Sequence, residues 1–234
     1  MGIIRMGPPE ELVLNIGQQF DIATFIETGT FHGGTAVWAS SHFSRVFTIE
    51  KSSVLYQMTS EKLSPYTNIK TIFGDSRESL KEIIADLQYP AIFWLDSHWC
   101  GQDSYGIHDE CPLLDEIICI NQSSSDNFIF IDDARLFLCP PPIPHDPAQW
   151  PTISETLKIL ETEHNRYTVI FEDVIISVPD YAKQFLITRL RSEQHQKMKY
   201  NPFNNLFHFI KKRIHQAKKF NKGYIISSPS FLKS

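Results

Sequence analysis

The sequence predicts an α/β fold in which a doubly wound, mostly parallel sheet carries helices on both faces. Apolar strand-like segments alternate with helical segments at intervals of roughly 20–25 residues. Residues 91–96 form an almost continuous apolar run, which is typical of a strand buried on both faces. The length of 234 residues suits one such domain, expected at 1–180, with a C-terminal extension at 181–234.

The alternation begins with a helix expected over 10–20, because Pro9 and Glu10 suit the first turn of a helix. An apolar strand over 22–26 follows. Its glycine-rich continuation predicts a tight turn and then a helix that begins at Gly33 or Gly34.

Two further strand–helix pairs follow in the same pattern. A strand over 46–50 precedes a helix over 52–63, which ends before Pro65. A strand over 69–73 precedes a helix over 76–87.

The last third of the domain contains one long interruption. After the apolar strand, a loop leads to a helix over 112–120 and a strand over 128–132. A proline-rich loop over 140–151 comes next. The remaining elements are expected at residues 154–163 (helix), 167–171 (strand) and 174–178 (strand).

The net charge of −5 hides two regions of opposite sign. Residues 1–180 hold 10 Lys and Arg against 26 Asp and Glu, whereas residues 181–234 hold 12 against 1. The acidic body would repel a phosphate backbone, so we expect no nucleic-acid partner. The segment 201–220 predicts a basic amphipathic helix, which either packs on or near the acidic body or contacts an anionic membrane surface or a partner.

The chain has the features of a cytoplasmic protein. It contains no apolar run of 18 residues, and its first ten residues lack an apolar signal core. Its four cysteines show no framework spacing, which suits reduced thiols. We therefore expect a cytoplasmic location.

The turn that follows the first strand predicts a ligand site. Glu27 and Gly29 are followed by Gly33, and the dinucleotide fingerprint would need a further glycine where Phe31 stands. A nucleoside without a diphosphate therefore fits the turn better. The alternative is a turn whose glycines serve only local geometry.

Carboxylates stand at the ends of five predicted strands, where an open α/β sheet binds its ligand. These residues are Glu27, Glu50, Asp75, Asp96 and Asp132. Glu50 occupies the place of a carboxylate that binds ribose hydroxyls, or else it is a solvated acid. Asp75 and the adjacent serine could bind adenine, or one of them could cap the next helix.

Asp96, Asp132 and Asp133 come from two adjacent predicted strands and predict a metal site. Three carboxylates close together raise one another's pKa unless a cation neutralises them, and hard oxygen ligands suit Mg²⁺. The alternative is that Asp133 caps the next turn while Asp96 pairs with Arg135 or another cation.

His98 stands two residues after Asp96, where a general base could reach a hydroxyl held on that metal. It could equally be a positioning donor or face solvent. A competing zinc site would use His98, Cys100, His108 and Cys111, although their spacing matches no standard zinc motif.

These motifs, in this order, resemble class I S-adenosylmethionine (SAM)-dependent methyltransferases, and most of all the metal-dependent macrocin O-methyltransferase-like branch. The resemblance covers residues 20–180 and rests on five stretches of sequence. They are Glu27–Thr35, Phe47–Glu50, Gly74–Ser76, Phe93–His98 and Phe130–Asp133.

The resemblance implies a Rossmann-like, seven-stranded sheet whose last strand is antiparallel. It implies that SAM binds to Glu27, Thr28, Gly29, Thr30, Gly33, Gly34, Thr35, Glu50, Asp75, Ser76 and Asp96. It also implies Mg²⁺ on Asp96, Asp132 and Asp133, with Asp96 and His98 in catalysis, although many members carry an acid at the His98 position.

The expected activity is methyl transfer to a hydroxyl of a small molecule such as a sugar, polyketide or phenol. Trp99, Tyr105 and Phe137 are candidates for the wall of the acceptor pocket. Two alternatives stay open: a catalytically silent nucleoside- or partner-binding regulator, and a metal-dependent glycosyltransferase that uses a nucleotide sugar.

Overall fold

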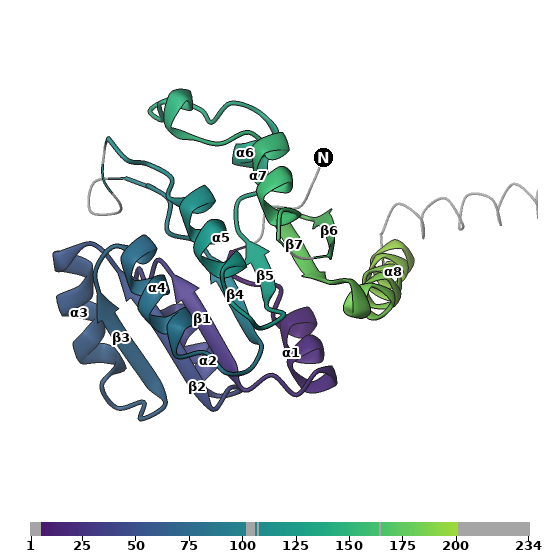
Figure 1. Ribbon diagram of the computed structural model, residues 1–234, viewed down its shortest axis with the longest axis horizontal. Coiled ribbons are helices and arrows are strands. Elements are labelled where there is room, and N and C mark those ends of the chain that lie inside the picture. Colours follow the sequence, from purple (N-terminus) through teal and green to yellow (C-terminus); the bar gives the residue numbers. More distant parts are fainter. Residues whose placement is uncertain (1–5, 102–105, 107, 164, 201–234) are drawn as a thin grey trace, which may run out of the picture. The chain divides into compact units, whose positions relative to one another are not determined.

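The computed structural model describes residues 6–101, 106, 108–163 and 165–200 (Figure 1). The chain divides into two units, Met1–Gln184 and Phe185–Ser234. The first unit contains the sheet. Helix α8 (Lys183–Tyr200) begins with the last two residues of the first unit and continues into the second. The basic amphipathic helix expected over 201–220 lies outside the described residues.

The first unit is built on a seven-stranded sheet with the order β3-β2-β1-β4-β5-β7-β6 (Figure 1). Strands β1 to β5 pair in parallel, whereas β7 is antiparallel to both of its neighbours. The predicted Rossmann-like α/β fold is thereby confirmed, including its single antiparallel strand. The strands are β1 (Thr24–Thr28), β2 (Arg45–Glu50), β3 (Ile69–Phe73), β4 (Ala91–Leu95), β5 (Phe128–Ile131), β6 (Arg166–Phe171) and β7 (Val174–Pro179).

Helices cover both faces of the sheet because successive strand side chains point in opposite directions. Phe25 of β1 packs against Trp38 and Phe43 on the face that α1 and α2 cover. Its neighbour Ile26 belongs to the core cluster that contains residues of α4, α5 and α7. The helices of this unit are α1 (Glu10–Gln19), α2 (Gly34–Ser40), α3 (Ser53–Leu63), α4 (Ser76–Ala85), α5 (Leu113–Asn121), α6 (Arg135–Leu138) and α7 (Ile153–Leu160), with the 3₁₀ turns η1 (Pro147–Gln149) and η2 (Asp180–Ala182).

Element boundaries differ from the prediction in two places that affect the site. Strand β1 extends to Thr28, so Glu27 and Thr28 belong to the strand itself. The short helix α6 precedes the proline-rich loop, and the η1 turn lies within that loop. Neither element was predicted. Single turns of helix carry too few residues to show a helical period in the sequence.

Parallel register brings the carboxyl ends of the central strands to one edge of the sheet. Thr28 pairs with Leu95, which pairs with Ile131. The chain continues this pairing beyond the strands, since Asp96 N donates to Thr28 O and Asp132 N donates to Leu95 O, both at 3.1 Å. The acids that follow β4 and β5 are therefore held side by side by backbone hydrogen bonds.

Candidate functional site

The turn after β1 is fixed closely against β4. Gly29 has φ +84°, and a Cβ built on it would lie 2.2 Å from the carbonyl oxygen of Asp96. Its N–H donates to Ile49 O at 2.9 Å. Only glycine fits there, because φ lies in the left-handed region and the atoms that a Cβ would meet belong to the backbone of Asp96 and Ser97. Gly33, with φ +71°, then precedes α2.

Glu50, at the end of β2, reaches back to the same turn. Its Oε2 accepts from Phe31 N at 2.9 Å and its Oε1 accepts from Ser52 N at 2.8 Å. Burial raises the pKa of Glu50, although these two amides oppose the rise. Phe31 itself has φ +46°, a left-handed conformation unusual for a bulky side chain. The predicted proximity of Glu50 and the glycine turn is thus present.

A cavity lies at this edge of the sheet, lined by residues that follow β1, β2, β3 and β4. Leu55 and Ile49 contribute apolar surface to it. Ser76 Oγ is buried beside the Glu116 carboxyl and, within the described part of the chain, has no hydrogen bond of good geometry. Burial raises the pKa of Glu116, and the Ser76 hydroxyl partly opposes the rise. The predicted site residues that line the cavity are Gly29, Glu50, Ser76, Asp96 and His98.

Four further residues of the predicted nucleoside site do not line the cavity. Glu27 is buried and accepts from Thr48 Oγ1 at 2.6 Å, with Thr35 as a second partner. Burial raises the pKa of Glu27 to about 8, so the carboxyl is largely neutral at neutral pH. Thr30 bonds to Thr48 at 2.6 Å, and Thr28 is fully buried. Glu27, Thr30 and Thr35 therefore contact one another or Thr48.

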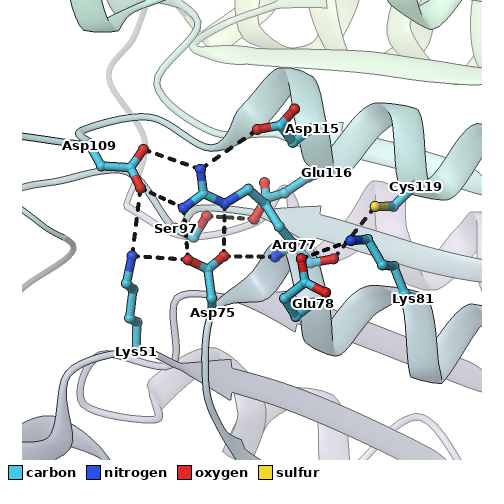
Figure 2. A network of polar contacts seen from close by, with 10 residues as sticks. All are labelled: Lys51, Asp75, Arg77, Glu78, Lys81, Ser97, Asp109, Asp115, Glu116 and Cys119. Atoms are coloured by element: carbon cyan, nitrogen blue, oxygen red, sulfur yellow. Dashed lines mark hydrogen bonds and ion pairs between the residues drawn. The ribbon is translucent and has the colours of Figure 1, made fainter.

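Asp75 is engaged by two cations (Figure 2). Its Oδ1 accepts from Arg77 N and Nε at 3.0 and 2.9 Å, and its Oδ2 accepts from Arg77 Nη2 and Lys51 Nζ at 2.8 and 2.9 Å. Arg77 and Lys51 also contact Asp109. A carboxylate offers about four lone-pair positions, and these four donors fill them. Asp75 therefore caps α4, the alternative that the sequence left open, while Gly74 and Ser76 on either side of it line the cavity.

Asp96, Asp132, Asp133 and His98 are brought together as predicted. His98 Nε2 lies 3.0 Å from Asp133 Oδ2, and its Nδ1 lies 3.7 Å from Asp96 Oδ1. Burial and the charges of Asp132 and Asp133 raise the pKa of Asp96 well above its usual range. Burial and the charge of Asp133 raise the pKa of Asp132 to about 7.

Asp133 differs from its two neighbours because a guanidinium cation, that of Arg135, bonds to it. Arg135 Nη1 donates to Asp133 Oδ1 at 2.5 Å and also contacts Asp173. Burial alone would raise the pKa of Asp133, but the His98 hydrogen bond and the Arg135 charge outweigh burial and lower it. The sequence left an Asp–Arg135 pair open for Asp96; in the structure Arg135 pairs with Asp133.

The described residues contain no group of three or more His, Cys, Asp or Glu side chains arranged to hold a metal ion. Asp133 is occupied by Arg135 and His98, and Asp132 Oδ1 accepts from Asp133 N at 2.8 Å. The three aspartates in this arrangement do not fit a Mg²⁺ site. The zinc alternative is not supported either, because His98, Cys100, His108 and Cys111 all belong to the described part of the chain and form no such group.

Two of the residues expected to line the acceptor pocket are packed in the interior. Trp99 and Phe137 are 9% and 4% exposed, and Phe137 packs on Trp150 with ring centroids 5.7 Å apart. Tyr105 lies outside the described residues. Sequence reasoning missed Trp150 and Glu110, which are partners 40 residues apart. It also missed Arg77, which pairs with Asp75 two residues before it and with the distant Asp109. In the part of the chain that the structure describes, no helix is long and apolar enough to span a bilayer.

Solved structures that align with this chain include O-methyltransferases. The O-methyltransferase TomG from Streptomyces achromogenes, in complex with SAM, aligns with a TM-score of 0.53 and 11% identity over 75% of this chain and 82% of that chain. The chain has the class I methyltransferase fold. Podospora anserina methyltransferase PaMTH1, bound to S-adenosylhomocysteine (SAH), gives 0.52 and 15% over 75% and 80%.

A third structure, the O-methyltransferase from Bacillus cereus in complex with SAH, gives a TM-score of 0.50 and 14% identity over 75% of this chain and 83% of that chain. At such low identities the likeness establishes the fold. No protein-family model matches the sequence, and no curated protein matches it. The resemblance to the macrocin O-methyltransferase-like branch stays a prediction.

Proposed function

We propose that the protein is a SAM-dependent methyltransferase that acts on an oxygen of a small molecule. The observation that carries the proposal is the cavity at the carboxyl edge of the sheet, where the Gly29 turn, Glu50 and Ser76 meet. Neighbours of the same fold were solved with SAM or SAH, and the cavity occupies the edge at which such sheets bind ligands.

The residues present fit the nucleoside part of SAM. Backbone N–H groups of Phe31, Ser52 and Lys51 use three of the roughly four lone-pair positions of the Glu50 carboxylate, which leaves one for a ribose hydroxyl. The Ser76 hydroxyl, which lines the cavity, offers a polar contact to a base, and Leu55 and Ile49 offer apolar surface. Arg77 and Lys51 already saturate the Asp75 carboxylate, so we assign the polar contact to adenine to Ser76 in place of Asp75. When bound, SAM supplies a methyl group on a sulfonium sulfur, which becomes a neutral thioether, a good leaving group, when the methyl is transferred.

His98 is the proposed general base. Because the pKa of Asp133 is lowered, its ionised carboxylate accepts a hydrogen bond from His98 Nε2–H, and this assignment leaves the lone pair on Nδ1. The distance of 3.7 Å from Nδ1 to Asp96 is too long for a hydrogen bond, so Nδ1 is available for the proton of an acceptor hydroxyl. Asp133 holds the ring, and Arg135 holds Asp133.

The proposed reaction uses this histidine–aspartate pair and routes no step through a metal ion. A divalent ion that took Asp133 as a ligand would compete with Arg135 and His98 for that carboxylate. Methyl transfer in 10 mM EDTA should therefore match transfer in buffer with MgCl₂. A loss of turnover in EDTA that MgCl₂ restores, with SAH binding unchanged, would show that the aspartates rearrange to bind a metal.

Calorimetric titration tests cofactor binding directly. We expect SAH and SAM to bind in the micromolar range, and UDP-glucose and NAD⁺ to give no heat. Glu50→Gln should weaken SAH binding about 10- to 100-fold, because it removes a charged acceptor of ribose hydroxyls. Glu61→Gln on the exposed surface of α3 is the matched control and should bind SAH as the native protein does. Binding of UDP-glucose without SAH would refute the proposal.

The acceptor can be found by a screen for SAM consumption with sugars, polyketides and phenols. With any acceptor so identified, His98→Gln should lower kcat about 100- to 10,000-fold, the usual range for loss of a general base, and leave SAH affinity within about twofold. Equal turnover by the His98→Gln variant would remove the base from the mechanism while leaving cofactor binding intact.

A further inference from the structure

Glu110 is a buried carboxylate outside the cofactor cavity that gathers donors from one distant segment. Its side chain is 3% exposed. Trp150 Nε1 donates to Oε2 at 2.6 Å, His145 Nδ1 lies 3.0 Å from Oε2, and Asp146 N donates to Oε1 at 3.0 Å. All three donors belong to the proline-rich segment that precedes α7.

The backbone of Glu110 extends the same connection toward the candidate active site. Trp99 N donates to Glu110 O at 2.7 Å, and Glu110 N donates to Gln149 Oε1 at 3.2 Å. Trp99 is the residue after His98. Glu110 therefore joins the segment that carries His98 to the segment that carries Trp150.

The indole that Glu110 holds lies against the proposed base. The centroid of the Trp150 ring is 5.4 Å from the ring centroid of His98, 5.0 Å from that of His145 and 5.7 Å from that of Phe137. Trp150 is 7% exposed and the His98 side chain 9%. The imidazole is thereby enclosed by Trp150 on one side and bonded to Asp133 on the other.

The charge on Glu110 indicates that this side chain orients its hydrogen-bond donors and does more than fill space in the interior. Burial opposes ionisation, but the hydrogen bonds from Trp150, Asp146 and His145 outweigh it and lower the pKa of Glu110. The carboxylate is therefore charged at neutral pH. A buried charge adds little net stability compared with an apolar side chain of the same size, but its directed hydrogen bonds fix the orientation of their donors.

We propose that Glu110 is a positioning residue for His98: its carboxylate fixes the Trp150 indole against the imidazole, which shields the ring from water and keeps it turned toward Asp133. The catalytic importance of this arrangement rests on the proposed function, in which His98 is the base. A merely structural role would predict that Glu110 fastens the proline-rich segment without any effect on His98.

Diethyl pyrocarbonate, which acylates accessible unprotonated imidazoles, measures the shielding of His98 without an acceptor substrate. Peptide mass spectrometry gives the modification rate of His98 relative to that of the exposed His42 in the same sample. In Glu110→Gln, which loses charge-assisted hydrogen bonds at constant size, we expect this ratio to rise about tenfold. In Trp150→Phe, which keeps a ring but loses the Nε1 donor, a rise of severalfold is expected.

Glu155→Gln is the matched control, because Glu155 makes the capping box of α7 five residues after Trp150. It undergoes the same exchange and loosens the adjacent helix end, so it should leave the His98 ratio unchanged at a temperature where all variants are folded. A ratio in Glu110→Gln equal to that of the native protein, or a rise of the same size in Glu155→Gln, would overturn the proposal. Trp150→Phe keeps it testable if Glu110→Gln does not fold.

SAH titration separates this inference from the proposed function. Each variant should bind SAH as the native protein does, because Glu110 and Trp150 lie outside the cofactor cavity. If the native protein fails to bind SAH while Glu110→Gln exposes His98, the methyltransferase proposal falls and the positioning of His98 by Glu110 stands. If SAH binds and His98 stays shielded in both Glu110→Gln and Trp150→Phe, the positioning of His98 by Glu110 falls and the methyltransferase proposal stands.

Discussion

Gly29→Ala perturbs the contact between the turn after β1 and the chain after β4. The added Cβ would lie 2.2 Å from Asp96 O, 2.8 Å from Asp96 C and 3.1 Å from Ser97 Cα. The neighbouring atoms are backbone, so relief requires a shift of about 1 Å between two strand ends. Forcing a non-glycine residue to φ +84° adds about 1–2 kcal/mol to an overpacking cost of about 1–3 kcal/mol.

Gly34→Ala is the matched control within the same turn, because a Cβ at Gly34 would meet nothing within 4 Å. Gly34 is the first residue of α2, where alanine should be neutral or stabilise by up to about 1 kcal/mol. We therefore expect Gly29→Ala to lower the free energy of unfolding by about 2–5 kcal/mol and Gly34→Ala to leave it unchanged or raise it slightly.

Urea unfolding followed by circular dichroism measures both variants, and an unchanged m-value makes the difference in midpoint a difference in stability. A loss of that size is a large fraction of the stability of a typical domain, so Gly29→Ala should also lose SAH binding at temperatures where Gly34→Ala retains it. If the two variants unfold within 1 kcal/mol of each other, the strands do not approach as closely as the contact implies.

Two other perturbations have expected outcomes. Because the pKa of folded Glu27 is raised to about 8, the folded chain binds a proton that the unfolded chain releases, so stability should fall as pH rises from about 4.5 to 8. Glu27→Gln should flatten this dependence by up to a few kcal/mol in urea titrations at pH 5 and 8.5; an unchanged profile would mean that Glu27 is ionised in the folded protein. Arg77→Lys, which cannot bind Asp75 bidentately, should destabilise by about 1 kcal/mol in low salt and by less in 1 M NaCl, and a loss that does not depend on salt would contradict an electrostatic role.

Local sequence was sufficient for the architecture. The order of strands and helices, the acids at strand ends and the need for glycine at position 29 all follow from properties of a few consecutive residues. Parallel strands then bring their carboxyl ends to one edge, so Glu50, Asp96 and Asp132 had to meet near the turn once the sheet formed. For this reason the cavity was predictable before its geometry was known.

The distant partners of the carboxylates were decided by tertiary structure. Asp75 and Asp133 each pair with an arginine two residues later in the sequence, but only the folded chain adds Lys51 to the first pair and His98 to the second. Glu110 carried no signal because its donor Trp150 lies 40 residues away. Sequence specifies which charges and hydrogen-bonding groups reach an edge of the sheet, whereas pairing among them depends on distances of a few tenths of an ångström that only the packed chain fixes.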